Sequence, residues 1–456
     1  MCNGGVSNAR AVAAGSDFSI AVDGNGIVWS WGDGLSGQLG NGSNSYQDTQ
    51  SPISGVSNTV SVAAGSSHTL ALRADGTVWA WGNNQGDLGE DGRLGLGVSG
   101  LGSTNSPAQS RLPTGISIVA IAAGDNFSLA VDTTGLVWGW GDNEQGQLGA
   151  GVPVGQGAST NVPTLVQGIS NVVAIAAGFD HTVALTADKT VWTWGDNSSG
   201  QLGWGGCCQA SAPGRVSALS NVVGIAGGLY FTLAVTSNGQ VFAWGDNAFG
   251  QLGTNTDFGS LASPHLVASV SNAVLVSAHP NGDHSMAMTV SNGVNQYWAW
   301  GDNDNGQVGN GTTTSPVYAP AGPLPFVHYN TCAECIQLGT SGTFTAYATG
   351  TLFLFFNDNK ALFGDNSGAY TVTVTGVVSG AVVPAVEETG VVVGTVSNGV
   401  IYSYTASGLC TNCNSGSCGE DASGVSTTTG LPRTCSGTSN FICPDLQCYS
   451  LVGKIE

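Results

Sequence analysis

The chain has 456 residues, of which 71 are glycine and 8% are charged, and its 9 basic and 29 acidic residues give a net charge of −20. So few basic residues argue against a partner that is nucleic acid or an anionic membrane surface, because both bind clustered Lys and Arg. No apolar run of about 18 residues is present, so we expect no membrane insertion.

A double-aromatic motif recurs six times from the N-terminus, at intervals of 50–59 residues. The first copy reads "VWSWGDGLSGQLG", and the second aromatic of each copy is Trp31, Trp81, Trp140, Trp194, Trp244 or Trp300. A second block, "VAAGSDFSIAV" in the first copy, precedes each motif. Its aromatic alternates along the chain as Phe18, His68, Phe127, His181, Phe231 and His284.

Each copy has the pattern of short β-strands. The segments "FSIAV" and "VWSW" alternate large and small side chains, as a strand with two different faces does. Stretches such as "DGNG" and "TSNG" between them predict hairpin turns, where glycine supplies a positive φ. About four strands per copy, repeated six times, predict an all-β fold whose first domain, residues 1–325, is a six- or seven-bladed β-propeller.

The combination of "HTLAL", a double-aromatic "VWAWG" and a following turn of the "GQLG" type resembles the regulator of chromosome condensation repeat family, from Ala9 to about Pro325. The resemblance implies one repeat per blade. The founding member has seven repeats, so the ring here is either six-bladed or completed by other sequence. That member activates a small GTPase and docks on chromatin. We expect neither role, since the chain lacks a basic surface and no residues mark a GTPase-facing site.

Two recurring polar positions of the repeats have structural interpretations. The His residues share a position with Phe, so we expect them to pack in the core. The Asp that follows each "WG", with Asn83 in the second copy, is expected to cap the turn behind it. We therefore predict no catalytic residues and no organic cofactor, and no motif for either is present.

The second predicted domain, residues 326–456, contains the strongest candidate for a ligand site. The loop "FNDNKALFGDNSG" brings Asp358, Asp365 and Asn366 into one short stretch between two predicted strands. Such a loop offers the oxygen ligands that Ca²⁺ prefers. The alternative interpretation is a polar hairpin tightened by Asx turns.

The same loop resembles the calcium loop of the bacterial galactophilic lectin family, a β-sandwich that binds galactose through Ca²⁺. The resemblance places the calcium ligands at Asp358, Leu362 through its carbonyl, Asp365 and Asn366. The terminal segment "FICPDLQCYSLVGKIE" resembles a part of the lectin that precedes the loop, and Cys443 and Cys448 match a cysteine pair there. The lectin-like β-sandwich is therefore either circularly permuted or completed in trans.

Eight of the 11 cysteines lie in this second domain. Disulfides are favoured over a zinc site, because no histidine lies among the later cysteines and the setting is rich in Ser, Gly and Thr. The candidates are Cys443, Cys448, Cys332, Cys335, Cys410 and Cys413. Disulfides in turn predict an extracellular or cell-surface location.

The sequence thus predicts a non-enzymatic binding or scaffold protein with a Ca²⁺-dependent lectin-like module for adhesion or glycan contact. Its partner would be a glycan or a protein. One alternative is the structural subunit of an extracellular filament or surface layer, which self-associates by strand or half-domain exchange. A second alternative is a propeller that regulates a GTPase, against which the cysteines argue.

Overall fold

A computed structural model divides the chain into two units, Gly4–Phe326 and Met1–Asn3 with Val327–Glu456. The structure describes residues 6, 8–85, 92–149, 151–206, 208–255, 259–291 and 294–324 with their side chains. Beyond residue 324 it describes the backbone of strands only. No helix among the described residues is long and apolar enough to span a membrane.

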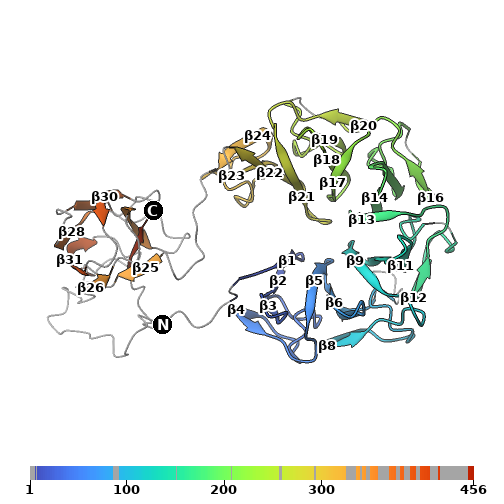
Figure 1. Cartoon of the computed structure of the whole chain (residues 1–456), viewed down its shortest axis with the longest axis horizontal. Coiled ribbons are helices and arrows are strands. Elements are labelled where there is room, and N and C mark those ends of the chain that lie inside the picture. Colours follow the sequence, from blue (N-terminus) through green and yellow to red (C-terminus); the bar gives the residue numbers. More distant parts are fainter. Residues whose placement is uncertain are drawn as a thin grey trace. The chain divides into compact units, whose positions relative to one another are not determined.

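The first unit is a ring of six antiparallel four-stranded sheets, or blades (Figure 1). Blade 1 contains β1 (Ala11–Ala14), β2 (Phe18–Val22), β3 (Val28–Gly32) and β4 (Gln47–Pro52); blade 2 contains β5 (Thr59–Ala64), β6 (His68–Arg73), β7 (Val78–Asn83) and β8 (Ser103–Gln109). Blade 3 contains β9 (Ile118–Ala123), β10 (Phe127–Asp132), β11 (Val137–Asp142) and β12 (Ser159–Leu165); blade 4 contains β13 (Val172–Ala177), β14 (His181–Thr186), β15 (Val191–Gly195) and β16 (Ala210–Arg215). Blade 5 contains β17 (Val222–Gly227), β18 (Phe231–Thr236), β19 (Val241–Gly245) and β20 (Leu261–Leu266); blade 6 contains β21 (Ala273–Ala278), β22 (His284–Ser291), β23 (Val294–Gly301) and β24 (Val317–Leu324).

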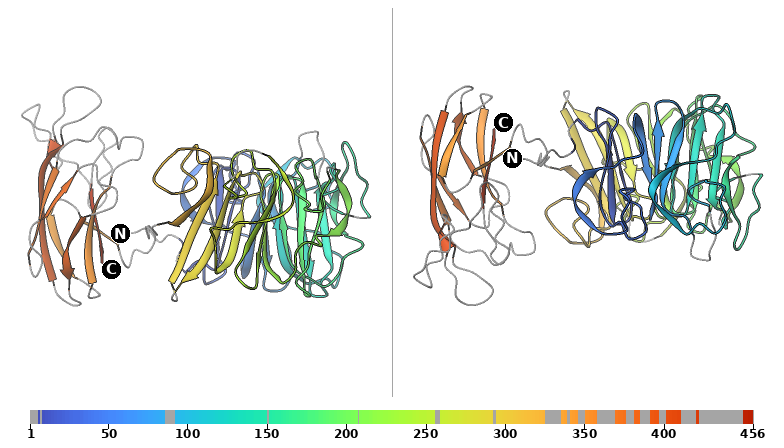
Figure 2. Two further views of the ribbon diagram at one scale, coloured as in Figure 1. Left: turned by 90° about the horizontal axis from the view of Figure 1, so that it is seen from above. Right: turned by 90° about the horizontal axis from the view of Figure 1, so that it is seen from below.

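Each blade runs in chain order from its inner to its outer strand, and the strands cross the ring from one face to the other (Figures 1 and 2). The second strand of a blade is buried on both faces, as in β10 and β14, so its sequence alternates between large and small side chains and not between buried and exposed ones. The glycine of each "WG" is the last or last but one residue of the third strand and has a positive φ, 103° at Gly32. A Cβ there would lie 2.5 Å from the carbonyl oxygen of Asp17, so no larger residue fits.

Hydrophobic cores lie between neighbouring blades rather than inside any one of them. The core between blades 1 and 2, for example, joins Phe18, Ile20 and Leu39 of blade 1 to Val62 and Trp81 of blade 2. Comparable cores fill the four junctions that follow around the ring. The second tryptophan of each motif is fully buried in the five junctions, as Trp81, Trp140, Trp194, Trp244 and Trp300.

The same tryptophans make one hydrogen bond that repeats at every one of these junctions. The indole Nε1 donates to a backbone carbonyl in the preceding blade, and a Ser or Thr hydroxyl donates to the same oxygen. Trp194 Nε1 lies 2.9 Å from Gln147 O, and Thr182 Oγ1 lies 2.8 Å from it. The equivalent acceptors for Trp81, Trp140, Trp244 and Trp300 are Gln38, Arg93, Gln201 and Gln251, at 2.8–2.9 Å. We call this paired contact the indole latch.

The sixth junction, between blades 6 and 1, is built differently. Among the described residues, no donor is recorded on the Gln307 carbonyl and no acceptor for the Trp31 indole. Val12 is 71% exposed, whereas Val62, its equivalent in blade 2, is 7% exposed. Few side-chain contacts join the two blades across this junction in the described part of the ring: Asn281 Nδ2 lies 3.2 Å from Ser16 Oγ, and the His279 ring interacts with the backbone of Ala14.

The strands described beyond residue 324 belong to the second unit. They are β25 (Cys335–Leu338), β26 (Ser341–Thr345), β27 (Gly350–Asn357), β28 (Ala369–Thr375), β29 (Ala381–Pro384), β30 (Val391–Val396), β31 (Ile401–Cys410), β32 (Glu420–Asp421) and β33 (Ser450–Ile455). They form sheets in the orders β25-β33-β27-β30 and β26-β31-β28-β29, with β32 paired to β31. The predicted propeller is confirmed with six blades, and the lectin-like sandwich stays a prediction.

The indole latch leads to a test of what holds the blades together. Replacing Trp194 with Phe keeps most of the buried apolar area and removes the Nε1 donor, so we expect a loss of about 1–2 kcal/mol in the free energy of unfolding. The matched control is Trp31→Phe, where no latch is recorded, and it should cost less. Urea unfolding of both variants measures the difference, and equal losses would contradict a role for the latch.

Candidate functional site

The order of strands assigns every loop of the ring to one of two faces. The loop between the first and second strand of a blade and the loop between the third and fourth lie at the same end, because successive strands are antiparallel. We call the ring surface formed by these two loop sets the acidic face. The hairpin between the second and third strands and the connection to the next blade form the opposite surface, which we call the basic face.

Carboxylates concentrate on the acidic face. Its loops hold Asp17, Asp33, Asp125, Asp142, Glu144, Asp180, Asp196, Asp246, Asp283, Asp302 and Asp304. Arg93 is the one basic residue among the described residues of these loops, and its Nη2 donates to the carbonyl of Gln85. The summed field at this face is therefore strongly negative.

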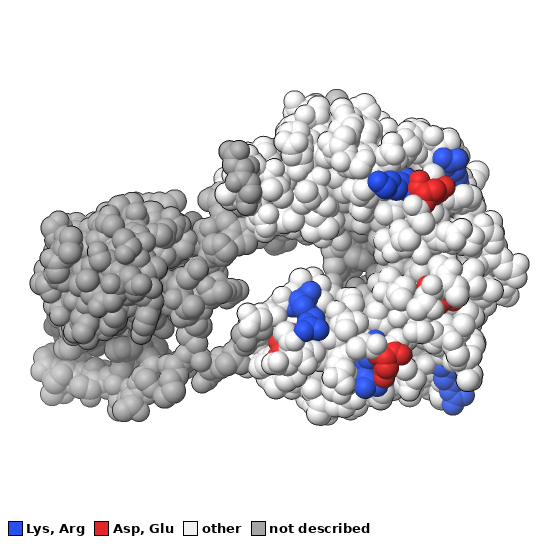
Figure 3. Space-filling model, in the orientation of Figure 1, with Lys and Arg blue, Asp and Glu red and all other residues white. Residues whose placement is uncertain are grey.

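The basic face holds Arg10, Arg73, Arg111, Lys189 and Arg215, together with Asp23, Asp75, Asp132 and Asp188. Figure 3 shows basic side chains spread around the ring on one face, with acidic ones beside several of them. The described residues of the basic face are thus nearly balanced in charge, whereas those of the acidic face are strongly negative.

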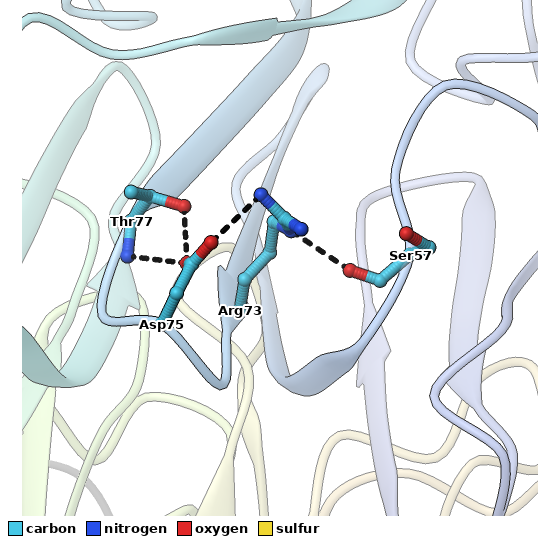
Figure 4. Close-up of polar contacts among 4 residues, drawn as sticks. All are labelled: Ser57, Arg73, Asp75 and Thr77. Atoms are coloured by element: carbon cyan, nitrogen blue, oxygen red, sulfur yellow. Dashed lines mark hydrogen bonds and ion pairs between the residues drawn. The ribbon is translucent and has the colours of Figure 1, made fainter.

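Arg73 illustrates how the basic side chains are held. Its Nε donates to the carbonyl of Ser57 at 2.8 Å, and its Nη1 lies 2.9 Å from Asp75 Oδ2, while Asp75 accepts from Thr77 (Figure 4). The Thr77 hydrogen bonds lower the pKa of Asp75. A hollow of about 370 Å³ between blades 1 and 2 is lined by Arg73, Arg10 and Asn58 among others. Local partners already engage both guanidinium groups there.

The Asp that follows "WG" caps its turn, as the sequence predicts. Asp142 Oδ1 accepts from the backbone N–H of Glu144 at 3.1 Å, and its Oδ2 accepts from Gln147 Nε2 at 2.7 Å. The pairs Asp33–Gln38, Asp196–Gln201, Asp246–Gln251 and Asp302–Gln307 repeat the side-chain bond at 2.7–2.9 Å. The same glutamines supply the latch carbonyls in four of the five junctions, so each cap also positions its junction.

Two of the three histidines of the repeat, His68 and His181, are packing residues as predicted, whereas His284 is half-buried. His68 and His181 are fully buried, and their Nε2 atoms lie 3.0 Å and 2.9 Å from Ser128 Oγ and Thr232 Oγ1 of the following blade. Burial lowers the pKa of His181 to about 4 and that of His68 well below its ordinary value. Both rings are therefore neutral near pH 7.

A second set of carboxylates comes from the inner loops around the central opening. Burial, together with Asp142, Asp125, Asp196 and Glu144, raises the pKa of Asp180 to about 8. Burial with Asp246 and Asp302 raises the pKa of Asp283 to about 6. The inner loops are tied to one another, as where Asp125 N donates to Phe179 O at 3.2 Å.

The sequence reasoning missed this inner set. Asp17, Asp180 and Asp283 each stand directly before the aromatic of the second block, which is a visible pattern. However, the blocks are separated by many residues, and only ring closure brings them to one opening.

The predicted calcium ligands Asp358, Leu362, Asp365 and Asn366 lie outside the described residues, as do the disulfide candidates Cys332, Cys413, Cys443 and Cys448. Cys335 and Cys410 lie in β25 and β31, whose backbone alone is described. These assignments stay predictions. Within the described residues, no group of three or more His, Cys, Asp or Glu could hold a metal ion.

The comparisons with known proteins match the propeller region of the chain. The family described as the RCC1-like domain matches residues 3–347. The probable E3 ubiquitin-protein ligase HERC6 of Homo sapiens is 38% identical over 198 residues, and the ultraviolet-B receptor UVR8 of Arabidopsis thaliana is 33% identical over 196 residues. Each match covers 42% of this chain, but only 19% of HERC6 and 43% of UVR8. The chain therefore spans less than half the length of these relatives.

The fold is similar to that of Prp20p from Saccharomyces cerevisiae. The two share a TM-score of 0.61 at 24% sequence identity, covering 72% of this chain and 78% of Prp20p. That structure was described together with the binding of Prp20p to Gsp1p and histones.

The raised pKa of Asp180 predicts how stability depends on pH. The folded state keeps the Asp180 proton up to about pH 8, whereas an ordinary Asp loses it near pH 4. The stability that this proton gives is therefore complete below about pH 4 and is lost as pH rises to about 8.

Asp180→Asn cannot ionise, so we expect this variant to be more stable than the wild type at about pH 9 and to lose most of that advantage at about pH 4. Thermal unfolding across this range measures the change. Asp48→Asn, at an exposed position of β4, is the charge-matched control. A stability difference that does not vary with pH would argue against the assignment.

Proposed function

Because this chain belongs to the RCC1-like domain family, we propose that it is a non-enzymatic protein-binding propeller whose acidic face binds a cationic segment of a partner protein. The observation that carries the proposal is the separation of charge between the two faces. Among the described residues, carboxylates from five blades converge on the acidic face, and Arg93 is the one base there.

Electrostatics explains why such a face would select a basic partner. Carboxylates around an opening with low-dielectric walls focus the field and speed the encounter with a cation. A cation near Asp180 and Asp283 also relieves the repulsion that raises their pKa values. Binding of histones by Prp20p is a precedent in a protein of similar fold.

Regulation of a small GTPase is the second candidate function. It is supported by the family and by the likeness to Prp20p, which binds Gsp1p. The family favours this role over the lectin-like adhesion role and over the filament subunit that the sequence suggested, and neither of these has support in the comparisons. Acceleration of GDP release from Gsp1p would favour the GTPase role, and unchanged release at saturating protein would exclude that GTPase.

The proposed function predicts salt-dependent binding of a basic peptide. A labelled Lys- and Arg-rich peptide should bind the intact chain, with an affinity that falls steeply from about 50 mM to about 300 mM salt, since screening weakens exposed charge interactions. Fluorescence anisotropy measures the affinity. Absence of binding at low salt would contradict the proposal.

Two double variants with the same charge change locate the binding face. The substitutions Asp17→Asn and Asp304→Asn on the acidic face should weaken binding at least about fivefold. The matched pair Asp75→Asn and Asp188→Asn lies on the basic face and should change affinity less than about twofold. Equal effects would show that net charge matters and the face does not.

A further inference from the structure

The six repeats provide an internal comparison for every loop position on the acidic face. Directly before the core aromatic, four blades carry small or polar pairs, namely Ser16–Asp17, Ser66–Ser67, Asp125–Asn126 and Gly282–Asp283. Blades 4 and 5 instead carry Phe179–Asp180 and Leu229–Tyr230. The fold does not require an aromatic there, because four blades form the same loop without one.

Phe179 and Tyr230 form a contacting pair at the inner loops of neighbouring blades. Their ring centroids lie 5.8 Å apart with an interplanar angle of 53°. Both side chains are half-buried, and neither belongs to the apolar core between blades 4 and 5. The pair therefore presents aromatic surface at the acidic face in addition to the junction packing below it.

Carboxylates share the acidic face with this pair. Burial and the negative charges of Asp180, Asp196, Asp283 and Asp125 raise the pKa of Tyr230. Asp180 follows Phe179 in the chain, and its Oδ1 accepts from Gln147 Nε2 at 3.1 Å. Aromatic rings bordered by carboxylates match a cation that has a flat, weakly hydrated face.

We propose that Phe179, Tyr230 and Asp180 form the anchor for an arginine side chain of the partner protein. The guanidinium group stacks on the aromatic pair and donates hydrogen bonds to Asp180, which releases its proton to solvent as the cation binds and becomes a carboxylate. Arginine fits better than lysine, since its planar group both stacks on aromatic rings and pairs with carboxylates. The inference rests on the proposed function, because it locates the contact within the acidic face.

The test uses two labelled peptides of equal charge, (Arg-Gly)₆ and (Lys-Gly)₆, with the full chain and fluorescence anisotropy as the readout. We expect the wild type to prefer the arginine peptide. Phe179→Ala and Tyr230→Ala should each weaken that peptide about tenfold and remove the preference, whereas Tyr230→Phe should keep it. Tyr230→Leu retains apolar bulk without an aromatic ring, so it should fold and also lose the preference.

Two exposed aromatics serve as matched controls. Tyr46 in blade 1 is 64% exposed and Phe249 in blade 5 is 39% exposed, and alanine at either should leave both affinities within about twofold of the wild type. Salt-dependent binding that is equal for the two peptides, and that Phe179→Ala and Tyr230→Ala leave unchanged, would overturn the anchor while the proposed function stands. No binding of either peptide to the wild type would overturn both.

Discussion

A hydrogen bond from a tryptophan indole to a backbone carbonyl of the preceding blade is the contact on which the ring depends. A four-stranded sheet has two faces to bury, and each blade here buries its faces against its neighbours rather than in a core of its own. The indole latch sets how deeply one blade enters the next, because its acceptor is fixed by the cap between Asp and Gln. Cap, latch and core therefore form one unit that repeats around the ring.

That repetition separates structural residues from candidates for function. The "WG" glycine, which is the same in every blade, and the capping residue, which is Asp in five blades and Asn83 in blade 2, are explained by geometry. Positions where one or two blades depart from the rest need another explanation. Arg73 occupies a position held by Asp or Thr in other blades, and Phe179 and Tyr230 occupy loop positions that are mostly small or polar. The exceptions, rather than the repeats, mark where a partner would be recognised.

The sequence was sufficient to predict the propeller, its strands and the roles of the capping Asp and the core His, since these depend on contacts within about one repeat. It was insufficient for the acidic face, because its carboxylates come from different blades and only the arrangement of the blades in a ring brings them to one surface. It also missed the acceptor of the indole, since period-two alternation gives the face of a strand and not the atom that a side chain reaches. The calcium loop resembles a known module, yet its residues lie outside the described part of the chain.

Because the sixth junction is held by fewer contacts than the other five, the ring has two weakly joined ends at blades 1 and 6. Five junctions carry the indole latch, whereas the sixth is held by the contacts of Asn281 with Ser16 and of His279 with Ala14. The ring therefore behaves as a linear array of blades whose two ends are weakly joined. In such an array each blade is stabilised by its neighbours, so the two end blades, 1 and 6, are the least protected against local unfolding. Amide exchange and proteolytic cleavage should therefore spread inward from this junction, and blades 3 and 4 should be the last to open.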